Sequence, residues 1–267
     1  MFERILKKRE DTYVEKHGLM GNADDYHVYH MRMTDYLIGF LIGFALGFVV
    51  VMIFFRITVM AVILGSICGI PAIKFYRKYR KEKRQKDLLI EFRDLLEALT
   101  TSYSSGKNTM EAFAESYQDL LSLYGEKSDI VNETRIIIAG MTNNIIIEDL
   151  LRDFAERCGL DDVESFTATF ESGLRQGGDI RQVVWDSRKI INDKIEIEME
   201  IKTILTEKEN ELNIMMVMPL IIMCALSGIG TMSAVVNTPL TVTVKIFAIL
   251  LFGAAYMMGR KIVNIRM

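Results

Sequence analysis

The chain has 267 residues, of which 50% are hydrophobic and 25% are charged, and its net charge is −3. This composition is too apolar for an ordinary soluble domain and too charged for a protein made only of membrane spans. The small net charge gives no reason to expect a nucleic-acid partner. Apolar runs near both ends of the chain flank a charged middle, so we expect membrane spans around a polar domain.

A polar arm, residues 1–35, precedes two uncharged runs that only Arg56 separates. The runs cover residues 36–55 and 57–73, and each is close to the roughly 17 to 25 residues that cross a bilayer. Because the first run lies behind a polar segment and is followed at once by the second, it does not resemble a cleavable signal peptide. We therefore predict a transmembrane hairpin over residues 36–76.

Glycines recur every four residues on one face of the first span, at Gly39, Gly43 and Gly47. This spacing permits the close approach of a second helix. Glycine is also common in membrane helices without such a role, so both interpretations stay open at this point.

The chain ends in two further apolar runs, which we predict to be spans within residues 214–259, and in a basic tail, residues 260–267. No carboxylate lies deep in any of the four expected spans, whereas ion-coupled transporters usually keep ionisable residues along their path. Arg56 and Lys245 stand near the predicted outer ends, where long side chains reach the interface, and we interpret them as anchors.

The stretch that follows the second span is strongly basic, and residues 77–86 are expected to be a linker. The positive-inside rule places this linker in the cytoplasm, and basic residues near both termini place the termini there too. The outer connections are then very short, which argues against a surface receptor. The basic residues are Lys74, Arg77, Lys78, Arg80, Lys81, Lys83, Arg84 and Lys86.

Residues 87–213 show helical spacing divided by Gly and Asn, without a convincing run of strands, and predict a cytoplasmic helical bundle. The first helix carries an apolar stripe and ends at Ser105-Gly106. Asn108 and Glu111 match a capping box at the start of the second helix. The expected stripes are Leu88, Phe92, Leu95, Leu99 and Tyr103, then Met110, Phe113, Ala114, Tyr117 and Leu121.

Three further short helices are expected before the chain returns to the membrane. Gly125 ends the second helix, and Ser128 is the expected N-cap of a third that reaches about residue 139. Gly159 terminates the fourth. The apolar stripes of the fourth and fifth helices are Ile147, Leu150, Leu151 and Phe154, then Phe166, Phe170 and Leu174.

A long helix is expected after Gly177-Gly178, capped by Asp179 and continuing into the third span, where Pro219 would bend it. One part is ambiguous, since apolar residues alternate with Glu over residues 195–201, which is a strand-like spacing. We predict helix there because Glu, Lys and Met are good helix formers and no turn signal flanks the segment.

No motif of a familiar active site is present: there is no phosphate loop, H-E-x-x-H, C-x-x-C pair or G-x-S-x-G elbow. We therefore predict no enzymatic activity, no catalytic residue, no cofactor and no metal. The cysteines Cys68, Cys158 and Cys224 form no disulfide framework and are expected to be unpaired.

Two groups of residues have side chains that bind cations in other proteins. His27 and His30 stand beside Asp24 and Asp25, but we expect the arm to be loosely ordered and predict no metal site there. An acidic run within residues 196–211 could attract a divalent cation or a basic partner, although a solvated face is the simpler interpretation.

Several segments together resemble the type II secretion system F domain over residues 87–235, and most closely the TadB and TadC platform proteins of tight-adherence pili. The segments are Phe92-Arg93-Asp94-Leu95-Leu96, Ser104-Ser105-Gly106, Gly140, Leu150-Leu151-Arg152-Asp153-Phe154-Ala155-Glu156-Arg157, Gly177-Gly178-Asp179-Ile180 and Met218-Pro219. The chain departs from the family pattern at Ser105, where Ala is usual, and at Asp179, where Asn is usual.

The resemblance implies a platform protein in the inner membrane of a bacterial cell, with both termini cytoplasmic, at the base of a type IV-like pilus or type II secretion machine. In this picture, a cytoplasmic ATPase hexamer contacts the F domain, and its motion passes through the helices to lift pilin subunits out of the membrane. The implied partners are the secretion ATPase, the pilin, a second F-domain platform subunit and the lipid bilayer, in a homo- or hetero-oligomer.

The ATPase would dock near the basic stretch from Arg77 to Lys86 and the turns at Gly106 and Gly177-Gly178, although lipid contact and plain helix caps explain these residues more simply. Charge reversal at Lys78, Arg80 and Lys81 should then weaken ATPase binding. The alternative is a four-span transporter or signalling subunit whose helical domain binds a soluble regulator. A membrane-embedded enzyme comes third, because the polar constellation is missing.

Overall fold

The computed structural model describes residues 15–228 except 20, 22, 56 and 57, together with residues 243, 247, 251, 253–255 and 257–259. The described residues form helices and connecting loops and no strand, as the sequence predicts. The chain divides into two compact units. The first consists of Met1–His30 and Lys78–Ile195, and the second of Met31–Arg77 and Glu196–Met267.

Two long helices, α3 (Thr58–Ser104) and α8 (Ile180–Gly228), each belong to both units. The stretch expected to be a basic linker, residues 77–86, lies inside α3 and is helical. Helix α8 runs through the ambiguous segment 195–201, which confirms the prediction of helix there, and it continues past Pro219.

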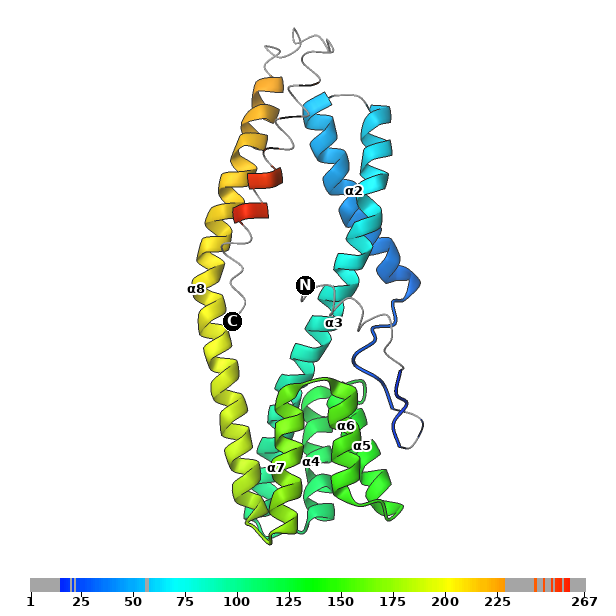
Figure 1. Ribbon diagram of the computed structural model, residues 1–267, viewed down its shortest axis with the longest axis vertical. Helices are drawn as coiled ribbons and strands as arrows, with labels where there is room; N and C mark the ends of the chain where they lie inside the picture. The colour runs from blue at the N-terminus through cyan, green and yellow to red at the C-terminus, as the bar shows by residue number, and fades with distance from the viewer. Residues whose placement is uncertain are drawn as a thin grey trace, which may run out of the picture. The chain divides into compact units, whose positions relative to one another are not determined.

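Four shorter helices lie beside α3 in the first unit (Figure 1). They are α4 (Thr109–Tyr124), α5 (Asp129–Thr142), α6 (Ile147–Cys158) and α7 (Asp161–Arg175). Neighbouring helices run in opposite directions because only short turns join them. Their apolar faces form one core, to which α3, α8 and Tyr26 of the arm also contribute.

The turns of the bundle gather at two ends. The turns at Gly106, Asn144 and Gly177 lie at one end, which we call the Gly106 end (Figure 1). The turns at Gly125 and Gly159 lie at the other, which we call the Gly159 end. Gly159 has φ 63° and ψ 32°, the left-handed conformation that commonly terminates a helix, and this confirms its predicted role.

The capping box at the start of α4 is confirmed. The Asn108 side chain accepts a hydrogen bond from the amide of Glu111 at 2.9 Å, and the Glu111 carboxylate accepts one from the amide of Asn108 at 3.2 Å. Asp179 caps α8 as predicted, without the reciprocal bond of a capping box: its Oδ1 accepts from the amide of Arg181 at 3.0 Å.

Ser128 occupies the N-cap of α5, as predicted, but its side chain does not cap the helix. Its hydroxyl instead donates to Glu91 of α3 at 2.8 Å, and Glu91 accepts the amide of Ile130 at 3.1 Å. The carboxylate that satisfies the start of α5 therefore comes from a neighbouring helix, a tertiary contact that local sequence does not reveal.

The predicted stripe of α3 is buried from Leu88 to Leu99 and half-buried at Tyr103, whereas that of α4 is partly wrong. Met110 is 38% exposed and Ala114 is also exposed. The buried face of α4 consists of Ala112, Phe113, Ser116 and Leu120. The inward position of Ser116, a polar residue, rotates this face away from the one that an apolar pattern indicates.

Helix α2 (Met33–Phe55) packs closely against the first part of α3 within the second unit. A Cβ atom added at Gly43 would lie 2.4 Å from the Cβ of Ala72 and 3.0 Å from the Cα of Gly69. A Cβ added at Gly69 would in turn lie 2.6 Å from the ring of Phe40. The glycine spacing of the first run therefore serves close helix packing, which decides between the two interpretations.

Among the described residues, two helical segments are long and apolar enough to cross a membrane, Met33–Ile53 and a window within Thr58–Ser104. They coincide with the first two predicted spans. The third and fourth predicted spans extend beyond the described residues. The predicted anchors Arg56 and Lys245 lie outside them as well.

Candidate functional site

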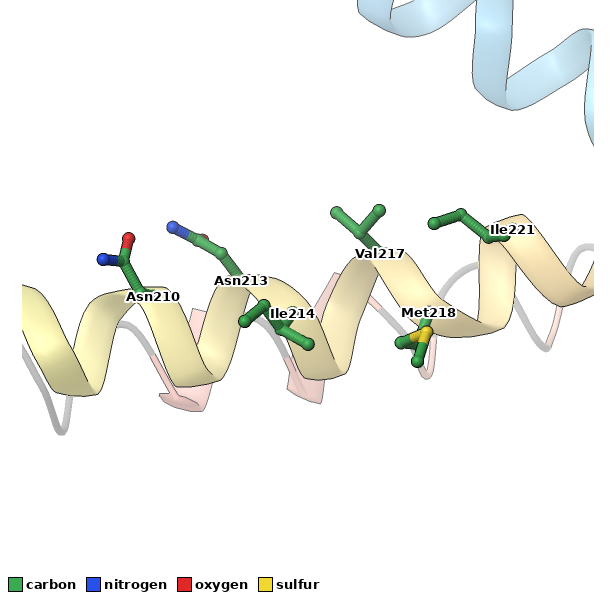
Figure 2. A pocket seen from close by; sticks show the side chains of 6 residues that line it. All are labelled: Asn210, Asn213, Ile214, Val217, Met218 and Ile221. Carbon is green, nitrogen blue, oxygen red and sulfur yellow. The ribbon is translucent and has the colours of Figure 1, made fainter.

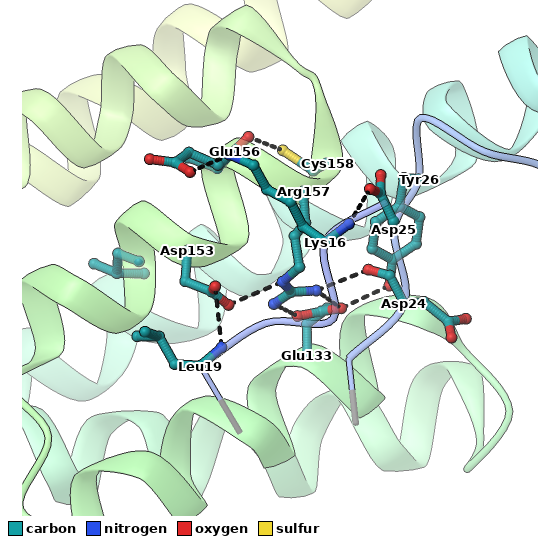
Figure 3. Close-up of polar contacts among 12 residues, drawn as sticks. Lys16, Leu19, Asp24, Asp25, Tyr26, Glu133, Asp153, Glu156, Arg157 and Cys158 are labelled. Carbon is teal, nitrogen blue, oxygen red and sulfur yellow. Dashed lines mark hydrogen bonds and ion pairs between the residues drawn. The ribbon is translucent and has the colours of Figure 1, made fainter. Parts of the chain in front are cut away.

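Residues 15–30 of the arm, apart from 20 and 22, lie against the Gly159 end of the bundle (Figure 3). For these residues, this corrects the expectation that the arm is loosely ordered. Ala23 and Tyr26 are only 5% and 2% exposed, because the bundle covers them. Composition alone suggested a solvated segment, since the arm is more polar than the spans that follow it and its order depends on bonds to distant residues.

Arg157, on α6, is the centre of this contact and is fully buried. Its Nη1 and Nη2 donate to the two carboxylate oxygens of Glu133 on α5, at 2.8 and 2.7 Å. Its Nε donates to Asp153 at 2.9 Å, and Nη1 also donates to the main-chain carbonyl of Asp24 at 2.9 Å. The planar guanidinium thus binds two bundle carboxylates and the arm backbone at once.

Tyr26 inserts beside this ion pair. Its hydroxyl donates to Glu133 at 2.9 Å, and its amide donates to the carbonyl of Arg157 at 3.0 Å. The guanidinium of Arg84, on α3, lies 4.6 Å from the centre of the Tyr26 ring, within the range of a cation–π contact. Arg84 also donates to Asp129 at 2.7 and 2.6 Å and to Asp24 at 2.8 Å.

The ionisation of these groups follows from burial and pairing. Burial raises the pKa of Glu133, and the hydrogen bonds from Arg157 and Tyr26 act against that rise. Burial alone would lower the pKa of Arg157, but its bonds to Glu133 and Asp153 raise it overall. Burial, followed by the Glu133 carboxylate, raises the pKa of Tyr26. Tyr26 therefore stays protonated and can donate, and Arg157 stays charged.

The C-terminus of α6 is covered by the arm and by α3. A Cβ atom at Gly159 would lie 2.4 Å from the His27 ring, so a larger residue there would displace that ring. The side-chain amide of Gln85 donates to the carbonyl of Cys158 at 3.1 Å. Burial raises the pKa of the Cys158 thiol to about 12, which suits a packing residue. Cys68 and Cys158 are unpaired, as predicted, and Cys224 lies outside the described side chains.

The histidines and acids considered as cation ligands do not converge. His27 contacts Asp25 at 3.2 Å, whereas His30 contacts Glu15 at 2.7 Å. No group of three or more His, Cys, Asp or Glu suited to a metal occurs among the described residues. The acids within residues 196–211 lie on two opposite faces of α8, because residues two apart on a helix are rotated by about 200°.

An open hollow lies along one face of α8 (Figure 2). Its lining consists of Asn210, Asn213, Ile214, Val217, Met218 and Ile221. These side chains all come from one helix, and they offer two amides and no titratable group. The hollow therefore brings together no group of side chains suited to catalysis.

The predicted ATPase-docking residues do not form one surface. Arg84 lies at the Gly159 end, whereas α3 ends at the Gly106 end, twenty residues later. At 1.5 Å per helical residue the two are about 30 Å apart. Part of the basic stretch is also in contact with the arm, since the Nε of Arg80 donates to the hydroxyl of Tyr29 at 3.1 Å.

Sequence reasoning missed Arg157, Glu133 and Tyr26. The available signal was a charged residue on an otherwise apolar helix face. Arg157 shares a face of α6 with Leu150 and Phe154, and Glu133 stands among apolar residues of α5. Charges at such positions are expected to be paired when buried, although the sequence does not name the partner.

The site as a whole is suited to binding a peptide segment. The guanidinium of Arg157 donates to a main-chain carbonyl of the arm. The carboxylates of Glu133 and Asp153 accept hydrogen bonds from a hydroxyl and a main-chain amide of the arm. Comparison of the chain with models of protein families, with curated proteins and with solved structures finds no match.

Proposed function

We propose that the protein is a platform subunit in the inner membrane of a bacterial cell, with both termini in the cytoplasm, serving a type IV-like pilus or type II secretion machine. It couples a cytoplasmic ATPase to the extraction and assembly of pilin. The proposal rests on the resemblance of residues 87–235 to the F domain and on the helical architecture, which suits that role.

The observation that carries the proposal is the continuity of α3 and α8. Each runs without a break from the buried bundle core into an apolar segment. In α8 the apolar side chains from Ile214 to Ile222 are largely exposed, as expected of residues that face lipid or other spans. A continuous helix transmits displacement, because its backbone hydrogen bonds resist bending.

The Gly106 end is the better candidate for ATPase docking. The basic stretch follows directly after an apolar helical segment, where cations favour the membrane surface. The Gly106 end lies about 30 Å further along α3, where a soluble partner has access. It also exposes an apolar side chain, Ile146, which is 58% accessible.

Affinity purification of the full-length protein from its native cells in mild detergents tests the function. We expect a hexameric secretion ATPase, a second F-domain subunit and a pilin to co-purify. Recovery of a solute-binding or signalling protein in their place, under several detergents, would favour the transporter or signalling alternative.

Ile146→Asp maps the docking end. Ile146 occupies the N-cap of α6 and its side chain makes no capping bond, so Asp there adds a cap worth about 0.5–2 kcal/mol and preserves the fold. We expect this variant to lose ATPase capture. Leu123→Gln, at an exposed position on α4 near the Gly159 end, is the matched control and should retain it. Loss only upon charge reversal at Lys78 and Lys81 would move the docking site to the basic stretch.

A further inference from the structure

The arm residues are held together by contacts of their own. The buried carboxylate of Asp25 accepts the main-chain amides of Lys16 and His27, both at 2.9 Å. The His27 ring contacts the same carboxylate at 3.2 Å. Residues 16–27 thus form a loop that its own hydrogen bonds close, independently of the bundle.

The bundle surface beneath this loop has its charges paired without it. Arg157 has Glu133 and Asp153 as partners, both from the bundle, and Arg84 has Asp129. If the loop leaves, each guanidinium keeps a carboxylate. Separation therefore avoids the large penalty of an unpaired buried charge.

The contacts between loop and bundle are those of a small interface with one anchor. Tyr26 is the buried side chain at its centre, and Arg157 meets the loop backbone at Asp24. The amide of Leu19 donates to Asp153 at 3.1 Å, and an exposed ion pair joins Lys16 to Glu156 at the rim. A buried Tyr beside an Arg, within a polar rim, is the usual arrangement of an interface hot spot.

We propose that residues 15–30 are a detachable strap that masks the arginines at the Gly159 end. When docked, the strap contacts Arg80 through Tyr29 and Arg84 through Asp24. When it detaches, these contacts end, and both guanidiniums, which are already partly exposed, become more accessible to an acidic protein surface. The strap carries acidic residues itself, and its Asp24 contacts Arg84. The docked strap therefore occupies the surface that an acidic partner would bind.

The strap is directly connected to α2. Only residues 31 and 32 separate it from the start of that helix. The three steps from residue 30 to residue 33 span at most about 11 Å when extended, so a larger movement of the start of α2 away from the bundle pulls on the strap. The strap is therefore placed to respond to displacement of the first apolar helix.

Hydrogen exchange of the full-length protein tests whether the strap detaches. Tyr26→Phe removes only the hydroxyl that donates to Glu133. Loss of one bond to a charged group predicts about tenfold faster exchange of the amides of residues 16–27, with α5 and α6 unchanged. Tyr117→Phe, on α4, is the control. Equal acceleration in α5 and α6, or no acceleration in the arm, would overturn the proposal.

A reversible crosslink tests whether the strap masks the arginines. Lys16→Cys and Glu156→Cys replace an exposed ion pair across the interface, in a background with Cys68→Ser, Cys158→Ala and Cys224→Ser. We expect oxidation to give a crosslinked monomer that binds poly-glutamate several-fold more weakly than the reduced protein. Equal binding in both states, or crosslinks only between two copies, would overturn the proposal.

Discussion

At the scale of single residues, the buried pair of Arg157 and Glu133 determines how the Gly159 end behaves. Both side chains are removed from water, so each depends on the other and on the hydrogen bonds around them. Such a pair adds less stability than its short distances suggest, because desolvation offsets the attraction. Loss of one member is far more damaging than loss of both.

Arg157→Met should therefore destabilise the bundle by about 3–5 kcal/mol, because Glu133 would remain buried as an unpaired charge. The double variant Arg157→Met with Glu133→Met should recover most of this loss. Thermal unfolding followed by the fluorescence of Trp185, the one tryptophan of the chain, measures the difference. Arg152→Met, at an exposed ion pair, is the control and should change little. Equal losses in the single and double variants would contradict this account.

Glu91 makes the stability depend on pH. Burial raises its pKa above the ordinary value of 4.5, despite hydrogen bonds from Ser128 and Ile130 that lower it. Because the pKa of Glu91 is higher in the folded state than in the unfolded state, its protonation favours the folded state. This contribution to the unfolding free energy is complete below pH 4.5 and is lost as the pH rises through the folded-state pKa. Unfolding free energies measured from pH 4 upward should show wild type losing stability relative to Glu91→Gln. A constant difference between the two would refute this.

At the scale of helices, the sequence predicts a helix boundary correctly where residues close together in the chain determine that boundary by themselves. The capping box at Asn108 and the helix end at Gly159 depend on local chemistry, and both appear as predicted. The start of α5 is different, because its cap comes from Glu91 on another helix. The ordered arm was missed for the same reason: its order depends on Arg157, far along the chain.

The close packing of α2 and α3 gives a prediction at this scale. Gly43→Leu places side-chain atoms where Ala72 already lies, so the two helices must separate. Spin labels at the exposed positions Leu37 and Phe75 should report a longer distance in this variant. Ala45→Leu, which adds the same side chain on an exposed face of α2, is the control and should leave the distance unchanged.

At the scale of the whole molecule, α3 and α8 are the elements that the two units share. The sequence divides α3 into a span, a linker and a domain helix, because apolar, basic and amphipathic patterns follow one another along it. The helix is nevertheless continuous: it runs through Pro71, the one proline within it, and the cations of the basic stretch are good helix formers. Composition thus changes along α3 where backbone structure does not.

If α3 transmits motion in the proposed machine, its continuity matters more than its charges. Lys78→Pro removes one backbone hydrogen bond and costs about 3 kcal/mol of helix stability, while the Gly106 end keeps its sequence. We expect this variant to capture the ATPase but to assemble little surface pilin, because displacement would be absorbed at the break. Lys78→Ala keeps the helix and should preserve both activities. Normal pilin assembly by Lys78→Pro would show that α3 is not the path of transmission, leaving α8 to carry it.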